Sequence, residues 1–451
     1  MENNSIIIKN KEKIIEKCID QSYQFRNNLS KSVISWKNTL LNLKDSVKYN
    51  YINLNSKFIP EEKSIHFLYK IFNPNESRGL KSYNQTLNKL LLITYRSNYK
   101  EQKNVKNNVI YTSDCGWGCM IRSSQMIFSR MIYKIFKSLY KNKFTSDIII
   151  KSVIPFFMDN NISMKEINIK SSDYINIGMD SYISQLNKFL EKKIIEKQYK
   201  KFNLLSFDPP FSIHKICTIG EIFGRTCGEW FSDYDLPKIY EIINTSFNII
   251  PNLSIFHFNS DIEMHSVIQK CFEKVDNTSY IDDKDCFTNE KKEKYIFKKM
   301  GAIFVSVRLG ITTISPDYFP SIKKLFECKQ FLGFIGGKVN SASYFFGYCD
   351  DDLLYLDPHF NQESCYDLDD KTFLTYINKT IYKLPFKSLQ CAFTIGFLFR
   401  DLNEFRHLYI FLKYFILSNI SCFHVHFEPY KFENKLTEKD IEKITDEEDD
   451  F

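Results

Sequence analysis

The chain has 451 residues, of which 43% are hydrophobic and 25% are charged, as in an ordinary globular protein with a large core. Its formal net charge is +7, spread along the chain without an arginine-rich stripe, which argues against nucleic-acid binding. Its twelve cysteines are scattered and form no CxxC pair, a pattern typical of reduced thiols rather than of a disulfide-bonded scaffold.

The composition predicts one large domain with an extension at each end. Residues 1–60 are rich in lysine and asparagine and predict a partly ordered N-terminal extension. The large domain is predicted at 61–430, with insertions near 140–201 and 276–294. Residues 431–451 predict an acidic, disordered tail.

Nothing in the sequence predicts a targeting or membrane-spanning segment. The first residues lack a signal-peptide layout. The most hydrophobic helical stretch, 408–417, is too short to span a bilayer and contains Lys413. We therefore expect a cytoplasmic protein.

The predicted elements alternate between helices and strands. A core element begins near Ile65, and apolar residues at helical spacing predict a helix over 120–137. Asp401 and Glu404 have the spacing of a capping box, which predicts a helix that continues to residue 417. Another helix is predicted at 237–243, and strands are predicted at 302–308, 344–349, 353–356, 392–399 and 422–427, of which 344–349 and 353–356 form a hairpin.

A cysteine stands where the long helix at 120–137 begins. Cys119 follows Gly116 and Gly118, which permit a sharp turn directly before it. The positive end of a helix favours a thiolate, and the thiolate is the nucleophilic form of cysteine. The pattern therefore predicts a reactive Cys119 that needs a histidine partner.

One of the eight histidines has a suitable neighbour. Asp357 and His359 end the apolar run that begins at Leu353. In an extended segment, residues two apart point the same way, so the acid can orient the imidazole while the imidazole takes a thiol proton. Asp-Pro pairs also form ordinary turns, and cysteines near glycines are often structural. These two motifs alone leave both interpretations open. A helix carrying Cys119 on a mainly antiparallel sheet carrying the acid and base predicts an α+β fold.

Further motifs accompany these two in a fixed order, and they cover the chain from about Ile65 to about Phe427. They are Thr94–Arg96, Ser113–Asp114, Gly116–Arg122, Phe211–His214, Gly224–Trp230, Arg308–Gly310, Leu332–Asn340, and Tyr355–His359 with Gln362. Each motif is weak alone, but the ordered set closely resembles the autophagins, the cysteine proteases of autophagy. The resemblance implies a papain-like fold.

The resemblance also implies roles for individual residues. Cys119 matches the family's nucleophile, and Asp357 and His359 match the other two members of its catalytic triad. Tyr95 matches a tyrosine whose hydroxyl helps to form the oxyanion hole, where a positioned O–H stabilises developing negative charge.

Two more positions match parts of the family's substrate cleft. Trp230 matches an aromatic residue that covers this cleft. The stretch 332–340 matches a flexible loop over it, in which Gly333, Gly336 and Gly337 permit hinge motion. Without the resemblance, Tyr95 and Trp230 are also compatible with core aromatics, and the glycines with an ordinary turn.

The implied function is proteolysis of an autophagy ubiquitin-like modifier. The enzyme is expected to cut the modifier's C-terminal tail after a glycine and to release the modifier from phosphatidylethanolamine, as autophagosome formation requires. It needs no metal or organic cofactor, reaches membranes only through its substrate, and is expected to be a monomer. Two alternatives remain open at this point: a catalytically silent, modifier-binding scaffold, and a protease directed at ubiquitin.

The chain departs from the family pattern at Cys115, Val339 and the spacer 99–110. The spacing predicts that Cys115 can trap an oxidised Cys119 as a disulfide.

Two other patterns suggest weaker sites. His424 and His426 alternate like metal ligands, but we expect an ordinary strand surface there. The segment 51–54 has the aromatic-x-x-aliphatic form of peptides that add a strand to autophagy modifiers, a match that often arises by chance.

Overall fold

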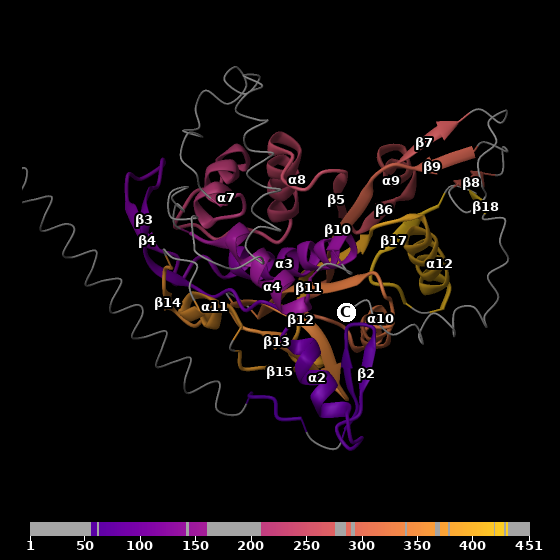
Figure 1. Ribbon diagram of the computed structural model, residues 1–451, viewed down its shortest axis with the longest axis horizontal. Helices are drawn as coiled ribbons and strands as arrows, with labels where there is room; N and C mark the ends of the chain where they lie inside the picture. The colour runs from indigo at the N-terminus through magenta and orange to yellow at the C-terminus, as the bar shows by residue number, and fades with distance from the viewer. Residues whose placement is uncertain are drawn as a thin grey trace, which may run out of the picture. The chain divides into compact units, whose positions relative to one another are not determined.

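A sheet of nine strands is the centre of the computed structural model (Figure 1). Its central path runs in the order β15-β13-β12-β11-β16-β10-β5, with β1 and β2 added beside β12. Every neighbouring pair is antiparallel except β10 and β5, which are parallel. The strands are β1 (Ile65–Phe67), β2 (Lys70–Phe72), β5 (Leu253–Asn259), β10 (Met300–Thr313), β11 (Phe331–Lys338), β12 (Ser341–Cys349), β13 (Asp352–Leu356), β15 (Tyr382–Pro385) and β16 (Gln390–Phe399).

The structure describes part of the chain, and all of this part belongs to the unit Asn55–Phe451. The predicted N-terminal extension up to residue 55, which includes the segment 51–54, lies outside the described residues, and so do 160–201 and the acidic tail from residue 432. The described residues are 56–60, 63–140, 144–159, 209–275, 286–289, 294–338, 341–365, 370–377, 379–418, 420–427 and 430–431.

The middle strands are buried on both faces. In β12 the seven residues from Ala342 to Tyr348 are all buried, and so are the seven from Gly301 to Val307 in β10. A strand with one solvent-exposed face alternates between apolar and polar residues, whereas a strand buried on both faces is mostly apolar. The sheet therefore has helices packed on both of its faces.

Helix α3 (Cys119–Tyr140) is the longest described helix and packs on β11 and β12. Its side chains are buried continuously from Ile121 to Phe136. The Phe128 ring stacks at 3.5 Å on Tyr240 of α8 (Asp235–Phe247) and at 4.8 Å on Phe304 of β10, measured between ring centroids. The helix therefore lies between the sheet and a second layer of helix, with its first residue at one end of the core.

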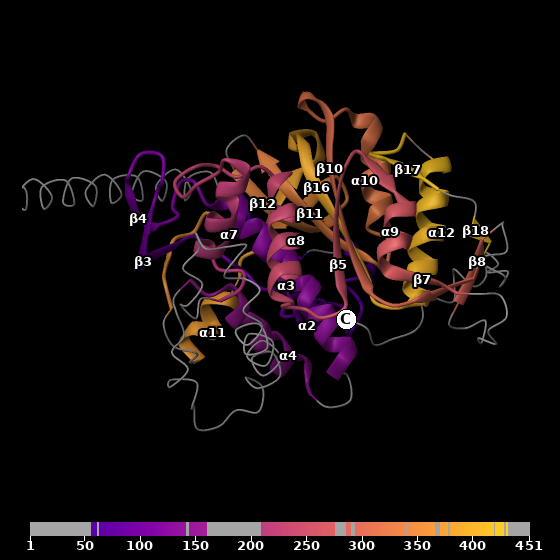
Figure 2. The same ribbon diagram turned by 90° about the horizontal axis from the view of Figure 1, so that it is seen from above.

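Most of the remaining helices lie at two ends of the sheet. Figures 1 and 2 both show α7 and α11 toward one end and α9, α10 and α12 toward the other, with α2 and α4 between them. Their bounds are α2 (Gly79–Leu87), α4 (Ser146–Val153), α7 (Ile213–Gly220), α9 (Met264–Cys271), α10 (Phe319–Leu325), α11 (Asp370–Ile377) and α12 (Leu402–Ser418). Short 3-10 helices are η1 (Ile154–Phe157), η2 (Glu221–Phe223), η3 (Pro316–Tyr318) and η4 (Phe386–Ser388).

Three small sheets complete the described part. One joins β3 (Arg96–Lys103) to β4 (Ile110–Ser113) and β14 (Gln362–Glu363), and another pairs β6 (Asp261–Glu263) with β17 (His424–His426). The third contains β7 (Phe272–Val275), β8 (Cys286–Asn289), β9 (Lys294–Phe297) and β18 (Tyr430–Lys431).

The predicted α+β fold is confirmed, with the helix that begins at Cys119 packed on a mainly antiparallel sheet. The predicted hairpin is β12 and β13, and the predicted last helix is α12. At its start the Asp401 carboxylate accepts the Glu404 N–H at 2.8 Å, as a capping box requires. Glu404 departs from the box by accepting the N–H of Arg400 at 2.8 Å instead of that of Asp401.

Parts of the two predicted insertions form ordered, buried elements. The first part of 140–201 is core, because α4 and η1 bury Ile149, Val153 and Phe157. The loop predicted at 276–294 contains β8, where Phe287 is buried. The polar residues that surround these elements concealed them in the sequence.

None of the helices within the described ranges combines the length and the apolar character that crossing a bilayer requires.

Candidate functional site

A tight turn places Cys119 at the N-terminus of α3. The backbone carbonyl of Asp114 accepts the N–H groups of Trp117 at 3.2 Å and Gly118 at 2.8 Å. Gly116 has φ +84°, a left-handed conformation that residues with a Cβ rarely adopt. The turn ends directly at Cys119, so its sulfur lies where the helix dipole favours negative charge.

Three residues from separate parts of the chain, Tyr95, Ala342 and His359, contact Cys119. Cys119 forms a small buried cluster with Tyr95 and with Ala342 of β12, and it also interacts with His359. Burial by itself raises the pKa of the thiol. Hydrogen bonding to His359 and its charge, followed by the Ala342 backbone and the Tyr95 hydroxyl, outweigh burial and hold the pKa of Cys119 below its usual value. The site therefore favours the thiolate.

His359 is held by Asp357 directly after β13. The Asp357 Oδ1 lies 2.5 Å from the His359 Nδ1 and also accepts the His359 backbone N–H at 3.0 Å. Burial lowers the pKa of His359, but the charge of Asp357, its hydrogen bond and the neighbouring Cys119 raise it to about 10. The His359 imidazole is therefore charged at neutral pH, and it interacts with Cys119, whose surroundings favour the thiolate form.

The backbone of Tyr95 fixes the segment that carries His359. The Tyr95 N–H donates to the Pro358 carbonyl at 2.9 Å, and the Tyr95 carbonyl accepts the Gln362 N–H at 3.0 Å. The Tyr95 and His359 rings meet edge to face, with centroids 5.4 Å apart. One residue therefore contacts the thiol through its side chain and holds both ends of the histidine segment through its backbone.

Trp230 lies against the turn before Cys119. It is 50% exposed, and its indole Nε1–H donates to the Gly116 carbonyl at 2.9 Å. A core aromatic would be covered, so the structure excludes that alternative for Trp230. The hydrogen bond ties an exposed indole to the turn that carries the candidate nucleophile.

The stretch 332–340 is not a flexible loop in the structure, and this prediction was wrong. Residues 331–338 form β11, which is paired with β12 on one side and β16 on the other. Residues 339–340 lie outside the described residues. Gly336 pairs with Ser343, and Gly337 pairs with the Ala342 that contacts Cys119. The glycines allow close strand packing here: a Cβ on Gly337 would lie 2.3 Å from the Ser341 carbonyl oxygen.

Cys115 packs against the cluster formed by Tyr95, Cys119 and Ala342. The disulfide between Cys115 and Cys119 stays a prediction.

His424 and His426 lie on β17 beside β6, with the His426 Nε2 3.4 Å from the Asp261 Oδ1. Within the described ranges, no three histidine, cysteine or acidic side chains are grouped as a metal site requires.

Sequence reasoning missed several residues at this site. The Ala342 contact depends on its position on β12, and the sequence carries no signal for it. Asp114 and Arg122 belong to the nucleophile motif but had no assigned role. They form a buried network with Asp159, which lies in the range predicted to be an insertion.

Comparisons with known proteins agree with this geometry. A family model described as the peptidase C54 catalytic domain matches residues 80–410, more than half of the chain. The chain is 25% identical over 324 residues to the cysteine protease ATG4C of Xenopus laevis, covering 69% of this chain and 66% of that protein. It is 27% identical over 286 residues to the cysteine protease ATG4B of Gallus gallus, covering 60% of each. It is 25% identical over 370 residues to the cysteine protease ATG4 of Candida albicans, covering 79% of this chain and 64% of that protein.

The chain spans less than two thirds of the length of each of these curated relatives. The part matched by the family model runs from α2 into α12 and includes Cys119 and His359. Its helix-on-sheet arrangement is the papain-like fold of this family. The chain therefore belongs to the peptidase C54 family, the autophagins.

Proposed function

We propose that this protein is a cysteine endopeptidase with Cys119 as nucleophile, His359 as general acid and base, and Asp357 as the group that orients His359. The observation that carries the proposal is the contact of Cys119, at a helix N-terminus, with an imidazole whose other nitrogen lies 2.5 Å from a carboxylate. This is the relation of nucleophile, base and orienting acid that acyl transfer needs.

The reaction proceeds in two halves. The Cys119 thiolate attacks the scissile carbonyl and forms a tetrahedral oxyanion, which the Tyr95 hydroxyl and the Cys119 N–H stabilise. The oxyanion collapses as the C–N bond breaks, and His359 gives its proton to the leaving amine. A thioester remains on Cys119. His359, now neutral, takes a proton from water, whose oxygen attacks the thioester and releases the acid and the thiolate.

The substrate we propose is an autophagy ubiquitin-like modifier, cut after a glycine in its C-terminal tail. The names of the relatives and the family membership support this class of substrate. The exposed Trp230 indole, tied to the turn before Cys119, favours a residue without a side chain at the cleaved bond. Release of the modifier from phosphatidylethanolamine uses the same chemistry, because that bond is also an amide, and membrane contact then comes through the substrate. In the cell, the proposed activity serves autophagosome formation in the cytoplasm.

Cleavage of a tagged modifier tests this function. A modifier with a C-terminal tag after its glycine is incubated with the wild-type protein, and the products are weighed by mass spectrometry. We expect release of the tag with the new C-terminus at the glycine, and no cleavage of the matching ubiquitin fusion. Binding without cleavage would favour the scaffold, and cleavage of the ubiquitin fusion would favour a ubiquitin protease.

Replacing Tyr95 by phenylalanine tests the oxyanion role. The ring and the backbone bonds to Pro358 and Gln362 are kept, and only the hydroxyl is lost. Losing one oxyanion donor typically costs about 100-fold in kcat, so we expect a loss of that order with KM little changed. An unchanged kcat would exclude the hydroxyl from the oxyanion hole, and an unchanged melting temperature serves as the folding control.

A further inference from the structure

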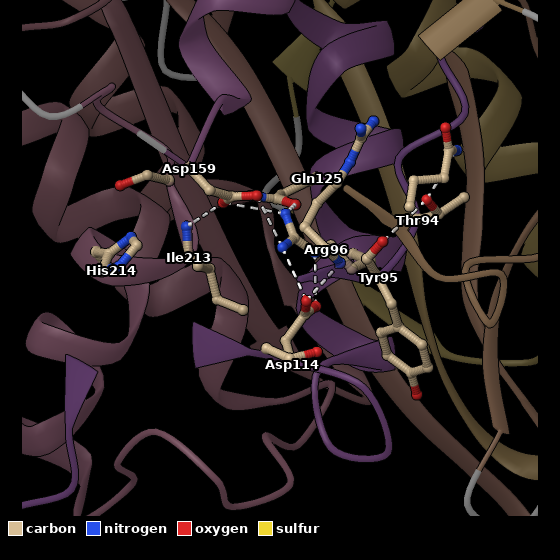
Figure 3. A network of polar contacts seen from close by, with 12 residues as sticks. Thr94, Tyr95, Arg96, Asp114, Gln125, Asp159, Ile213 and His214 are labelled. Atoms are coloured by element: carbon tan, nitrogen blue, oxygen red, sulfur yellow. Dashed lines mark hydrogen bonds and ion pairs between the residues drawn. The ribbon is translucent and has the colours of Figure 1, made fainter. Parts of the chain in front are cut away.

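A buried carboxylate links the two segments that carry the proposed oxyanion donors. The Asp114 Oδ1 accepts the backbone N–H of Arg96 at 2.7 Å, directly after Tyr95 in the chain. The same carboxylate accepts the Arg122 guanidinium twice, at 2.7 Å from Nε to Oδ2 and at 3.1 Å from Nη2 to Oδ1. Figure 3 shows dashed lines from the Asp114 carboxylate to the Arg96 backbone and to the network that includes Gln125 and Asp159. The carboxylate thus joins the Tyr95 segment to α3.

Arg122 is fixed from its other side as well. It lies on α3, three residues after Cys119. Its Nη1 donates to the Gln125 Oε1 and to the Asp159 Oδ1, each at 3.1 Å, and its Nη2 lies 2.9 Å from the Asp159 Oδ2. Asp159 also accepts the N–H of Ile213, the first residue of α7, at 3.2 Å. The guanidinium is therefore held between two carboxylates and cannot shift toward either.

The turn before Cys119 is packed directly on the Asp114 carboxylate. A Cβ on Gly118 would lie 2.4 Å from the Asp114 Oδ2, closer than any relaxed contact. The side chains of Arg122 and Asp114 have no exposed surface, so water cannot replace a lost contact. A movement of this carboxylate must therefore move the Cys119 backbone, the Tyr95 segment, or both.

We propose that Arg122, through Asp114, is a positioning residue that sets the separation of the two proposed oxyanion donors, the Tyr95 hydroxyl and the Cys119 N–H. This inference rests on the proposed peptidase function. A buried ion pair contributes little net stability compared with apolar residues of the same volume. A bidentate guanidinium does impose a fixed geometry, which an oxyanion hole needs.

The conservative variant Arg122→Lys separates this role from a merely structural one. Lysine keeps the charge, but one ammonium group cannot hold both carboxylates in the fork geometry. We expect kcat for the tagged modifier to fall by about 100-fold, as when one oxyanion donor is lost, while KM stays near the wild-type value. Alkylation of Cys119 by iodoacetamide forms no oxyanion, so its rate should change far less than kcat. Its pH midpoint should rise only slightly, because the Tyr95 hydroxyl ranks behind His359 and the Ala342 backbone in lowering the pKa of Cys119.

Arg400→Lys is the matched control. Arg400 forms a nearly buried ion pair with Glu404, and its Nη1 donates to the Lys134 carbonyl near the other end of α3. The same substitution there disturbs a comparable pair far from Cys119. We expect it to lower the melting temperature without lowering kcat. An equal loss of kcat in both variants would overturn the proposal, since the loss would then reflect general destabilisation.

Further outcomes are also decisive. An equal loss of alkylation and hydrolysis in Arg122→Lys would show that the ion pair of Arg122 with Asp114 acts on the thiol or on the fold. Unchanged hydrolysis would show that this ion pair has no positioning role.

Asp159→Asn is the second variant, used if Arg122→Lys does not fold. It keeps a side-chain oxygen for Arg122 and weakens only the contact of Arg122 on the side away from Asp114. That variant should lower kcat with normal alkylation, and an unchanged kcat would overturn the proposal. Failure of the wild type to cleave the modifier would instead refute the proposed function.

Discussion

Replacing Cys119 by alanine is expected to abolish tag release from the modifier while leaving binding of the modifier intact. Loss of the nucleophile removes the covalent route, and kcat/KM should fall by about 10⁴-fold or more. Cys119 is only 7% exposed, and alanine fills most of its space, so the cluster with Tyr95 and Ala342 keeps its packing. The measurement is tag release on a gel, with affinity measured separately by calorimetry.

Cys115→Ala is the matched control for this variant. It removes a thiol that packs against the same cluster and lies four residues earlier in the chain. We expect it to keep activity near the wild-type level. Cleavage that survives in Cys119→Ala and is lost in Cys115→Ala would show that Cys115, and not Cys119, is the nucleophile.

Replacing Asp357 by asparagine is expected to lower kcat by about 10³-fold or more and to change the pH profile. The folded protein raises the pKa of His359 to about 10, so the imidazolium is present at neutral pH and is lost only as the pH rises through that value. Without the Asp357 charge, burial is the largest remaining contribution and lowers the pKa of His359. The alkaline limb of kcat/KM should therefore move to lower pH.

The same variant should also change the chemistry of the thiol. A charged His359 holds the pKa of Cys119 down, so a neutral imidazole lets burial raise it. The pH midpoint of iodoacetamide alkylation should therefore rise in Asp357→Asn. The matched control is Asp352→Asn at the start of β13, which breaks a partly exposed ion pair with Lys383 of the neighbouring strand β15. A wild-type alkylation midpoint in Asp357→Asn would contradict the role of Asp357.

The parts of the fold that the sequence predicted are those with a local signal. The apolar spacing after Cys119 found α3, and the acidic residues at 350–352 marked the turn between β12 and β13. The glycines of β11 misled, because glycine permits both a flexible loop and a close strand contact. Only the pairing of β11 with β12 and β16 decides between these two uses.

The candidate site divides in the same way. Cys119, Asp357 and His359 could be found because their chemistry requires particular side chains at short spacings. The contact of Ala342 with Cys119 could not be found from the sequence. Ala342 acts through its backbone, which every residue has, and only its position beside Cys119 gives it this role. The pairing of Arg122 with Asp159 joins residues 37 positions apart and depends on where η1 ends. Such contacts follow from tertiary packing alone.

Covalent capture tests the identity of the nucleophile most directly. A modifier whose C-terminal glycine is replaced by a glycine vinyl methyl ester is mixed with the wild-type protein, and the adduct is digested and located by mass spectrometry. We expect one adduct, on the Sγ of Cys119. An adduct on Cys115, or no adduct with a protein that still binds the modifier, would contradict the assignment of Cys119 as the nucleophile of a modifier-directed peptidase.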